Sequence, residues 1–417
     1  MNGKKRKVIV IGGGASGMAA AYFAAESGAD VLLLEKNEKL VKKLYITGKG
    51  RCNVTNASDV QEFLQHVVSN PKFLFSAASG FNSSDVMDWI EKLGTPLKTE
   101  RGKRVFPVSD HASDIIRALE NGLKKQHVRI MLHSEVREIL INEKRASGVV
   151  LADGGTISGD AVIIAAGGLS YPSTGSTGDG YRFAEYASHT IKKTRPALVP
   201  ITAEEDYISD MEGLSLRNVR LIIPYGKKKV FSEFGEMLFT GDGISGPLCL
   251  SASSVIGAAL EQSPLPAKID LKPALTGEQL DARILGLFAE TPNRTFKNVV
   301  RPLFPASLWP VIVRLSGIPE DTPAHAVTKK ERLAFSELIK AFPLTLSGTH
   351  GFREAVITQG GVSTKEISPS TMESKRCRGL YFAGEVLDLD AFTGGFNLQI
   401  AWTTGHCAGI AAALTDE

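Results

Sequence analysis

The chain has 417 residues, of which 43% are hydrophobic and 22% are charged, as in an ordinary globular protein. This length allows two or three domains with sizeable cores. The formal net charge is +3, so charge alone predicts no strong attraction to nucleic acid or to an anionic membrane. No apolar run approaches the roughly 18 residues that span a bilayer. The basic run at residues 4–7 is interpreted as a solvated terminus, and the apolar stretch behind it enters a glycine-rich loop and not a signal-peptide cleavage site.

The cysteines and histidines show no spacing typical of a metal site. The four cysteines have no C-x-x-C pair, and the eight histidines show no paired ligand spacing. This pattern predicts a reducing, cytoplasmic location and no disulfide framework, zinc site or other metal. Cys52 lies in a basic, glycine-rich loop, where thiolate character is favoured. The cysteines are Cys52, Cys249, Cys377 and Cys407.

The chain opens with an alternation of strand, helix and strand. Val8–Ile11 is a short, β-branched run that ends at glycines, which is typical of a buried parallel strand. Ala15–Ser27 is rich in alanine and predicts a helix that ends at Gly28. A second apolar run, Val31–Leu34, predicts the next strand of the same sheet.

Three glycines between the first strand and the helix form the pattern G-x-G-x-x-G. Gly12 permits a tight turn, Gly14 lets the backbone approach a pyrophosphate, and Gly17 lets the helix pack close to the strand. Free N–H groups at the start of the helix attract the phosphate charge. Glu35 ends the second strand and is placed to accept a hydrogen bond from a ribose hydroxyl. The stretch predicts a dinucleotide site and leaves FAD and NAD open.

The remainder of the first half predicts further helices and strands. Ser58 and Gln61 have the spacing of a capping box. The glycine-rich run at 48–51 lets backbone and cations approach an anion together, and 171–181 is a Gly/Ser/Thr loop. The predicted helices are Asp59–Val68, Asp85–Leu93, Ala112–Lys125 and Arg182–Ser188, and a hairpin is predicted over Arg101–Pro107. The predicted strands are Val128–His133, Val136–Ile141, Gly148–Leu151 and Ala161–Ala165.

The second half changes character twice. Residues 195–276 predict a β-rich inserted domain, and residues 277–343 predict a small helical subdomain with helices at Glu278–Glu290, Pro305–Ser316 and Lys329–Ala341. From residue 344 the chain returns to a glycine-rich style, with a strand at 379–383 and an alanine-rich helix that follows Gly394-Gly395 and runs to Leu414. We therefore expect a discontinuous nucleotide domain from residues 1–194 and 344–417. A second glycine-rich site far along the chain favours the longer cofactor, FAD.

Several motifs together resemble a known family. They are GGGASG near the start, TGKGRCNVTN at 47–56, GGLSYPSTGSTGDGY at 167–181, GISGP at 243–247, TQGGV at 358–362 and GLYFAGEVLDLDAFTGGFNLQIAWTTG at 379–405. The set is similar to bacterial flavoproteins known as aminoacetone oxidases or NAD(P)/FAD-dependent oxidoreductases, some of which reduce unsaturated 3-oxo bile-acid intermediates. The resemblance implies an α/β fold with a discontinuous Rossmann-type FAD-binding domain, an inserted β-barrel-like domain and a small helical domain.

The resemblance also implies which residues hold FAD. The pyrophosphate would lie at Gly12, Gly14, Ala15, Ser16 and Gly17, and the adenosine ribose at Glu35 and Lys36. The middle and the flavin end of the cofactor would be lined by Lys49, Gly50, Arg51, Cys52 and Asn53. Val136, Ala166 and Gly167 would enclose the adenine, and Gly384, Glu385 and Asp388 would serve the ribityl and phosphate region. Phe396, Asn397 and Leu398 would direct helix N–H groups at the flavin.

The candidate catalytic residues are His350, Arg353 and Tyr171, with Glu354 beside them, as proton donors or substrate anchors. One departure from the family pattern affects the substrate. Where the family has Thr-His-aromatic-Gly before the SGP turn, this chain has Thr-Gly-Asp-Gly at 240–243.

Three classes of function remain open at this point. The first is an FAD-dependent oxidoreductase that acts on a small organic substrate with NAD(P)H or O₂ as second partner, either as an enone reductase or as an aminoketone oxidase. The second is a flavoprotein that acts on RNA, which the near-neutral charge does not favour. The third is a flavin-binding protein with a regulatory output.

Overall fold

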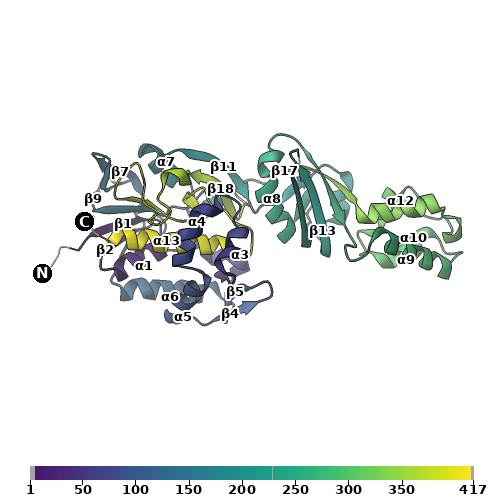
Figure 1. The fold of residues 1–417 in the computed structure, drawn as a ribbon, viewed down its shortest axis with the longest axis horizontal. Helices are drawn as coiled ribbons and strands as arrows, with labels where there is room; N and C mark the ends of the chain where they lie inside the picture. The colour runs from purple at the N-terminus through teal and green to yellow at the C-terminus, as the bar shows by residue number, and fades with distance from the viewer. Residues whose placement is uncertain (1–4, 228, 415–417) are drawn as a thin grey trace. The chain divides into compact units, whose positions relative to one another are not determined.

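The computed structural model describes residues 5–227 and 229–414. The chain divides into two compact units, Met1–Pro196 with Phe352–Glu417, and Ala197–Gly351 (Figure 1). Within the described residues, no helix is both long and apolar enough to cross a membrane.

The first unit is built on a parallel sheet of five strands in the order β19-β10-β1-β2-β6. The central strand β1 pairs with β10 on one side and with β2 on the other. Its apolar residues are buried on both faces, which explains the uninterrupted apolar run in the sequence. The strands are β1 (Lys7–Ile11), β2 (Asp30–Leu34), β6 (Arg129–Met131), β10 (Ala161–Ile164) and β19 (Leu380–Phe382).

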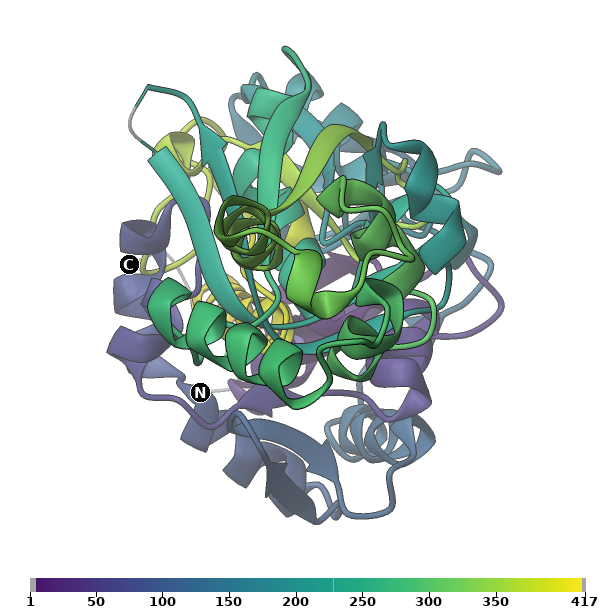
Figure 2. The same cartoon turned by 90° about the vertical axis from the view of Figure 1, so that its right-hand side faces the viewer.

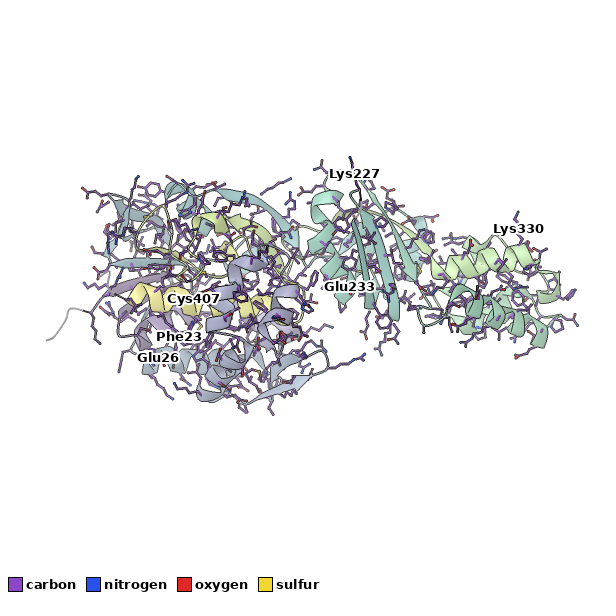
Figure 3. All side chains as sticks on the ribbon, in the orientation of Figure 1. Phe23, Glu26, Lys227, Glu233, Lys330 and Cys407 are labelled. Atoms are coloured by element: carbon purple, nitrogen blue, oxygen red, sulfur yellow. The ribbon has the colours of Figure 1, made fainter. Side chains whose placement is uncertain are left out.

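Two helices from opposite ends of the chain pack side by side in this unit. They are α1 (Ala15–Glu26) and α13 (Phe396–Ala413), the purple and yellow helices of Figure 1. A Cβ atom at Gly405 would lie 2.5 Å from Ser16 O, and one at Gly409 would lie 2.4 Å from Ala20 O. The two backbones therefore approach each other closely because α13 carries glycine at these positions. Figure 3 labels Phe23 on α1 and Cys407 on α13 in this packed pair.

Smaller elements cover the sheet. Helix α5 starts with a capping box in which Asn82 and Asp85 bond to each other's backbone. The other helices of this unit are α2 (Lys42–Ile46), α3 (Val60–Gln65), α4 (Pro71–Gly80), α5 (Ser83–Lys92), α6 (Ala112–Lys125) and α7 (Asp179–Tyr186). The smaller sheets combine β3 (Thr55–Asn56), β5 (Arg104–Pro107) and β4 (Leu97–Glu100); β7 (Val136–Asn142), β8 (Arg145–Leu151) and β9 (Thr156–Ser158); and β11 (Ile191–Ala197) with β18 (Ile357–Val362).

Several predicted boundaries in this unit are wrong. The N-cap of α3 is Asp59, whose carboxylate accepts the Glu62 N–H, so Ser58 does not start the helix. Helix α7 begins at Asp179, three residues before the predicted start, because Gly178 in a left-handed conformation can precede it. Helices α2 and α4 were not predicted. Within the basic terminal run, Lys4 lies outside the described residues, but Arg6 is buried and donates to the Leu414 carbonyl, so this part of the run is not solvated.

The second unit contains a closed barrel of six strands in the order β12-β15-β14-β13-β16-β17. Strand β17 alternates buried and partly exposed residues and pairs with both β12 and β16. Residues 344–349 thus belong to the barrel, whereas the sequence grouped them with the nucleotide domain. The strands are β12 (Ile201–Ala203), β13 (Ser215–Tyr225), β14 (Lys229–Phe239), β15 (Gly243–Ser245), β16 (Leu265–Asp270) and β17 (Phe342–Thr349).

Helices complete the second unit. Two of them begin with capping boxes, Thr276 with Gln279 at α9 and Thr328 with Glu331 at α12. Helix α8, which starts at Pro247, was not predicted in this β-rich stretch. The helices α9 and α12 form the green group toward the viewer in Figure 2. The helices are α8 (Pro247–Leu260), α9 (Gly277–Glu290), α10 (Phe296–Val300), α11 (Trp309–Ser316) and α12 (Lys329–Lys340).

Candidate functional site

The turn between β1 and α1 has the close backbone contacts that the glycine pattern predicts. Gly12 has a φ of +101°, and a Cβ atom there would lie 2.5 Å from Ala165 O. A Cβ atom at Gly17 would lie 1.8 Å from Gly12 O, so only glycine lets the helix start this near to the strand. Gly14 has no atom within 4 Å of the place where its Cβ would be. The backbone at Gly12 and Gly17 is therefore packed against the rest of the unit, whereas Gly14 has space beside it for a ligand.

The first turn of α1 has N–H groups available for an anion. Its N-cap is Gly14, which supplies no side-chain hydrogen bond to the helix. The C-terminal motif also reaches this turn, since a Cβ atom at Gly384 would lie 2.4 Å from Ser16 Oγ. The Gly384 N–H donates to Thr404 Oγ1 over 2.9 Å, which fixes this segment against α13. Motifs more than 360 residues apart in the chain therefore meet at one helix start.

Glu35 is buried at the end of β2, next to the same turn. Its Oε2 accepts the Gly13 N–H at 2.7 Å, and its Oε1 accepts the Asn37 N–H at 2.8 Å. These bonds hold the carboxylate in one orientation while leaving it further acceptor capacity. The neighbouring Lys36 turns to another group, because its Nζ lies 2.6 Å from Asp179 Oδ2.

Glu385 joins three segments of the first unit. Its Oε2 lies 2.5 Å from Lys43 Nζ, and its Oε1 accepts from Ser170 Oγ at 2.6 Å and from the Thr358 N–H at 2.8 Å. This carboxylate is therefore bonded on both oxygens to protein groups. Thr358 belongs to the TQGGV motif, and its Oγ1 in turn accepts the N–H groups of Leu169 and Ser170.

A second helix start with available N–H groups lies at α13. Its N-cap, Gly395, has a φ of +102° and gives no side-chain cap. The Asn397 side chain closes the preceding loop, with Oδ1 accepting the Ala391 N–H at 2.9 Å and Nδ2 donating to Ala391 O at 2.7 Å. Phe396 packs over the His66 ring at a centroid distance of 4.3 Å. The positive end of the α13 dipole thus lies beside a rigid loop.

Two buried acceptors near these helix starts have no hydrogen-bond donor among the described residues. They are Asn53 Oδ1 and Asp390 Oδ1. Asp390 is fully buried, and its other oxygen accepts from Gln359 Nε2 at 3.1 Å. Burial raises the pKa of Asp390 to about 6. Orphaned acceptors, an open position at Gly14 and two uncapped helix starts fit a long cofactor that carries both a diphosphate and hydrogen-bond donors.

The loop at 47–53 is partly used by the protein itself. Lys49 has a left-handed backbone with a φ of +58°. The Arg51 guanidinium lies 2.5 Å from Glu100 Oε1 and from Asp110 Oδ1, and 4.0 Å from the centre of the Phe106 ring. The charge of Arg51 is therefore neutralised within the protein, and only its backbone is left to contact a cofactor from this loop. The expected thiolate character of Cys52 is wrong, because full burial raises the pKa of its thiol to about 12.

The remaining predicted cofactor residues lie on the first unit. Val136 is buried in β7, and Ala166 and Gly167 follow β10, with Gly167 at a φ of +72°. Asp388 accepts from Asn70 Nδ2 at 2.9 Å, and burial raises the pKa of its carboxyl group. Gly50 has a φ of +83° and nothing within 4 Å of its Cβ position.

The candidate catalytic residues are placed on different parts of the chain. Tyr171 starts a 3-10 turn in the first unit with a φ of +51°, and its N–H donates to Phe352 O at 3.1 Å. Arg353 is exposed in the same unit. His350 belongs to the second unit, where its Nε2 lies 3.0 Å from Asp242 Oδ2. Asp242 belongs to the Thr-Gly-Asp-Gly sequence that replaces the family's Thr-His-aromatic-Gly. A histidine therefore does lie at this turn, but it is His350, which directly follows β17.

Sequence reasoning missed several residues that organise the site. Lys43, Ser170 and Thr404 each bond a residue of a predicted motif. Ser170 and Thr404 stand inside the motifs at 167–181 and 379–405 but had been given no role, and Lys43 carries no spacing signal of its own. The TQGGV motif was recognised, and Thr358 within it was the available signal for the link to Glu385.

The fold and the two uncapped helix starts define a class, the Rossmann-type FAD-binding flavoproteins. The chain belongs to the family described as HI0933-like protein Rossmann domain, whose model matches residues 6–411. It is an FAD-dependent oxidoreductase. These findings confirm the family resemblance, the fold class and FAD as the cofactor.

Three similar proteins illustrate the family and the fold. A 3-dehydro-bile acid delta(4,6)-reductase from Clostridium scindens is 33% identical over 390 residues, which cover 93% of this chain and 94% of that protein. A ribosomal RNA dihydrouridine synthase from Escherichia coli is 33% identical over 384 residues, 91% of each chain. The solved structure of a 3-ketosteroid-delta4-(5alpha)-dehydrogenase from Rhodococcus jostii, in complex with 4-androstene-3,17-dione, has a TM-score of 0.54 at 14% identity, with coverage of 100% of this chain and 98% of that one. This last likeness concerns the fold alone.

Proposed function

We propose that this oxidoreductase reduces a carbon–carbon double bond conjugated to a carbonyl group in a small organic substrate such as an unsaturated 3-oxo steroid or bile acid. The observation that carries the proposal is the relative named a 3-dehydro-bile acid delta(4,6)-reductase, which is 33% identical over 93% of this chain. NAD(P)H is the proposed source of electrons.

Three parts of the first unit would have separate roles in binding FAD. The first turn of α1 would bind the diphosphate, and Glu35 would accept a hydrogen bond from the ribose. The start of α13 would stabilise negative charge at the flavin and thereby favour its reduced form. Bound FAD supplies hydride transfer, and the protein orients the substrate and supplies a proton.

His350 and Tyr171 are the proposed proton donors. The Asp242 carboxylate, with Oδ2 3.0 Å from His350 Nε2, would hold the imidazole in one orientation. Arg353 is the proposed anchor for a substrate carbonyl or carboxylate. The variants His350→Gln and Tyr171→Phe would show which residue is the donor. Loss of the donor lowers the rate of substrate reduction and leaves flavin reduction by NAD(P)H unchanged.

A second substrate class is favoured by a specific observation. The relative named a ribosomal RNA dihydrouridine synthase is as identical to this chain as the bile-acid enzyme is. Both names describe the addition of hydrogen to a double bond conjugated to a carbonyl, in a steroid ring or in a uracil ring. Uridine in ribosomal RNA is therefore the second candidate, with the same proposed chemistry.

One experiment tests these alternatives. The FAD-loaded protein is reduced anaerobically with NADH or NADPH, and its reoxidation is followed by absorbance after addition of a 3-oxo-4,6-diene steroid, unmodified ribosomal RNA or O₂. Fast reoxidation by the steroid supports the proposal, and fast reoxidation by the RNA alone selects the second candidate. If neither nicotinamide bleaches the flavin but an aminoketone does, the protein is an oxidase and the proposal is wrong.

A further inference from the structure

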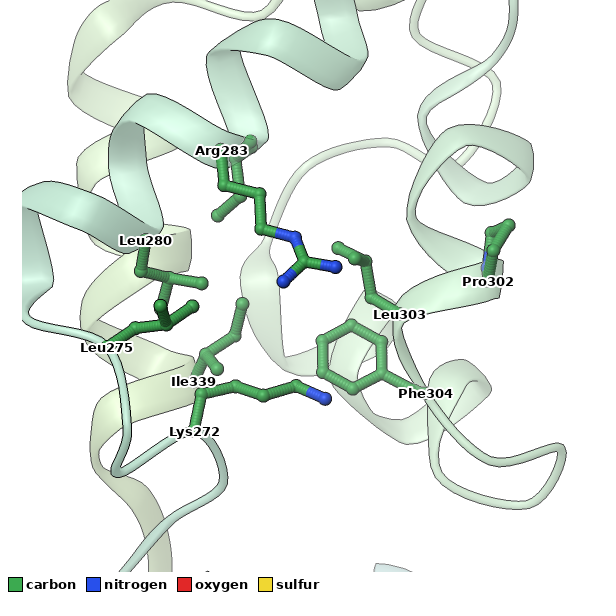
Figure 4. A pocket seen from close by; sticks show the side chains of 9 residues that line it. Lys272, Leu275, Leu280, Arg283, Pro302, Leu303, Phe304 and Ile339 are labelled. Atoms are coloured by element: carbon green, nitrogen blue, oxygen red, sulfur yellow. The ribbon is translucent and has the colours of Figure 1, made fainter.

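A cavity in the helical part of the second unit combines two cations with an apolar wall (Figure 4). The cations are Lys272, which follows β16, and Arg283 on α9. The apolar wall is contributed by three segments, including Leu280 on α9, Phe304 after the 3-10 turn at 301–303, and Ile339 on α12. In Figure 4 both cationic head groups point into the space beside the Phe304 ring.

Neither cation has an acidic partner in the described part of the chain. The nearby acids are already engaged: Asp270 Oδ2 lies 2.6 Å from Lys340 Nζ, and Asp281 pairs with Arg332 at 2.7 Å. Burial lowers the pKa of Lys272, and the charge of Arg283 lowers it further. Lys272 is half-buried and Arg283 is exposed, so two like charges share one cavity, an arrangement that an anion would relieve.

The shape of the cavity limits the anion. Its volume is about 100 Å³, which is less than the roughly 150 Å³ of an engineered cavity that accommodates benzene. The fork of an arginine matches a carboxylate in geometry, and the apolar wall matches a short hydrocarbon body. A fully hydrated inorganic anion would leave that wall in contact with water.

We propose that this cavity binds a small organic acid, with the carboxylate between Lys272 and Arg283 and a short apolar body against Phe304 and Ile339. An aliphatic acid of about three to four carbons suits a cavity of this size. The site lies entirely within the second unit, and the proposal does not rest on the proposed redox function.

Isothermal titration of the full-length, FAD-loaded protein tests the site. The probes are propionate and butyrate, with 1-propanol and 1-butanol as uncharged analogues and inorganic phosphate as an anion without an apolar body. We expect 1:1 binding of the acids with a Kd of about 1 mM. We expect weaker binding of the alcohols and of phosphate by at least tenfold.

Variants locate the binding and include a matched control. Lys272→Met and Arg283→Met keep the apolar stems and remove one charge each, so each is expected to weaken acid binding at least tenfold. Arg283→Lys keeps the charge without the fork and should give an intermediate affinity. Lys330→Met removes a charge from an exposed position near the start of α12, whereas the lining residue Ile339 lies near its end, and this variant should bind like the wild type (Figure 3 labels Lys330).

Three outcomes would overturn the proposal. The first is equal binding of acids and alcohols, and the second is undiminished binding in both Lys272→Met and Arg283→Met. The third is binding of a short oligouridylate at these residues without binding of the acids, which would make the cavity a nucleic-acid contact. Flavin absorbance and thermal melting check that each variant is folded.

Discussion

Two alanine substitutions in one turn should separate folding from cofactor binding. In Gly17→Ala the new Cβ atom would lie 1.8 Å from Gly12 O and 3.3 Å from Ala165 Cβ. Ordinary contacts lie at 3.4–4 Å, so α1 must move away from β1 by more than an ångström. The obstacle is a backbone oxygen that cannot rotate aside. We expect the free energy of unfolding to fall by about 3 kcal/mol, at the upper end of overpacking effects.

Gly14→Ala adds the same methyl group three residues earlier with the opposite consequence. Gly14 has φ −80° and ψ −173°, which any residue adopts, and nothing lies within 4 Å of its Cβ position. The apoprotein should therefore keep its stability to within about 0.5 kcal/mol. The methyl group would occupy the space that the diphosphate is proposed to approach, so FAD affinity should fall at least tenfold, or about 1.4 kcal/mol.

Two measurements on the apoproteins decide the matter. Urea unfolding gives stability, and flavin fluorescence during titration with FAD gives affinity. Gly286→Ala is the control, because it adds a methyl group at an exposed position of α9 with nothing within 4 Å. Wild-type FAD affinity in Gly14→Ala would refute the approach of the diphosphate to this glycine. Wild-type stability in Gly17→Ala would refute the contact argument.

Three further substitutions test single groups. Glu35→Gln should weaken FAD binding about tenfold, because it removes a charge-assisted hydrogen bond, and unchanged retention after dialysis would contradict its ribose role. The pKa of Asp390 is raised to about 6, so the folded apoprotein holds this proton longer than the unfolded chain and loses up to about 3 kcal/mol of stability as the pH rises from about 4 to about 6. Asp390→Asn should remove that loss in urea titrations across this range, and an identical slope would show that the group does not titrate there. Lys272→Met should raise the ligand-free free energy of unfolding, because it removes a partly desolvated charge that Arg283 also repels, and a lower melting temperature would contradict this.

The parts of the fold that the sequence predicted well depend on local patterns. The apolar run of β1, the glycines of the turn and the alanine-rich helix α1 each carry their information within a few residues. The periodic patterns that predict helices from Glu278 and from Lys329 are also local, and α9 and α12 begin within one residue of these positions. The prediction of an α/β nucleotide domain with a β-rich insert rests on these signals.

The parts that escaped prediction depend on partners distant in the sequence. The basic residues next to Cys52 in the sequence predict a thiolate, but burial in the folded unit raises the pKa of its side chain and keeps it a thiol. Arg51 is available to an anion by its position in the loop, and only the fold brings Glu100 and Asp110 to it. Helix α8 lies in a stretch of strands and turns, and its mostly apolar residues give little helical periodicity because it is buried in the unit. No window of local sequence contains these contacts.

The close packing of α13 on α1 has a consequence for synthesis of the protein. During translation the first 196 residues leave the ribosome without the helix that covers α1, and that helix is made only at the end of the chain. The barrel unit, by contrast, comes from one uninterrupted stretch and can complete its core earlier. Flavin loading should therefore follow release of the finished polypeptide. A premature stop codon before residue 396 should yield a chain with a folded barrel and no yellow colour.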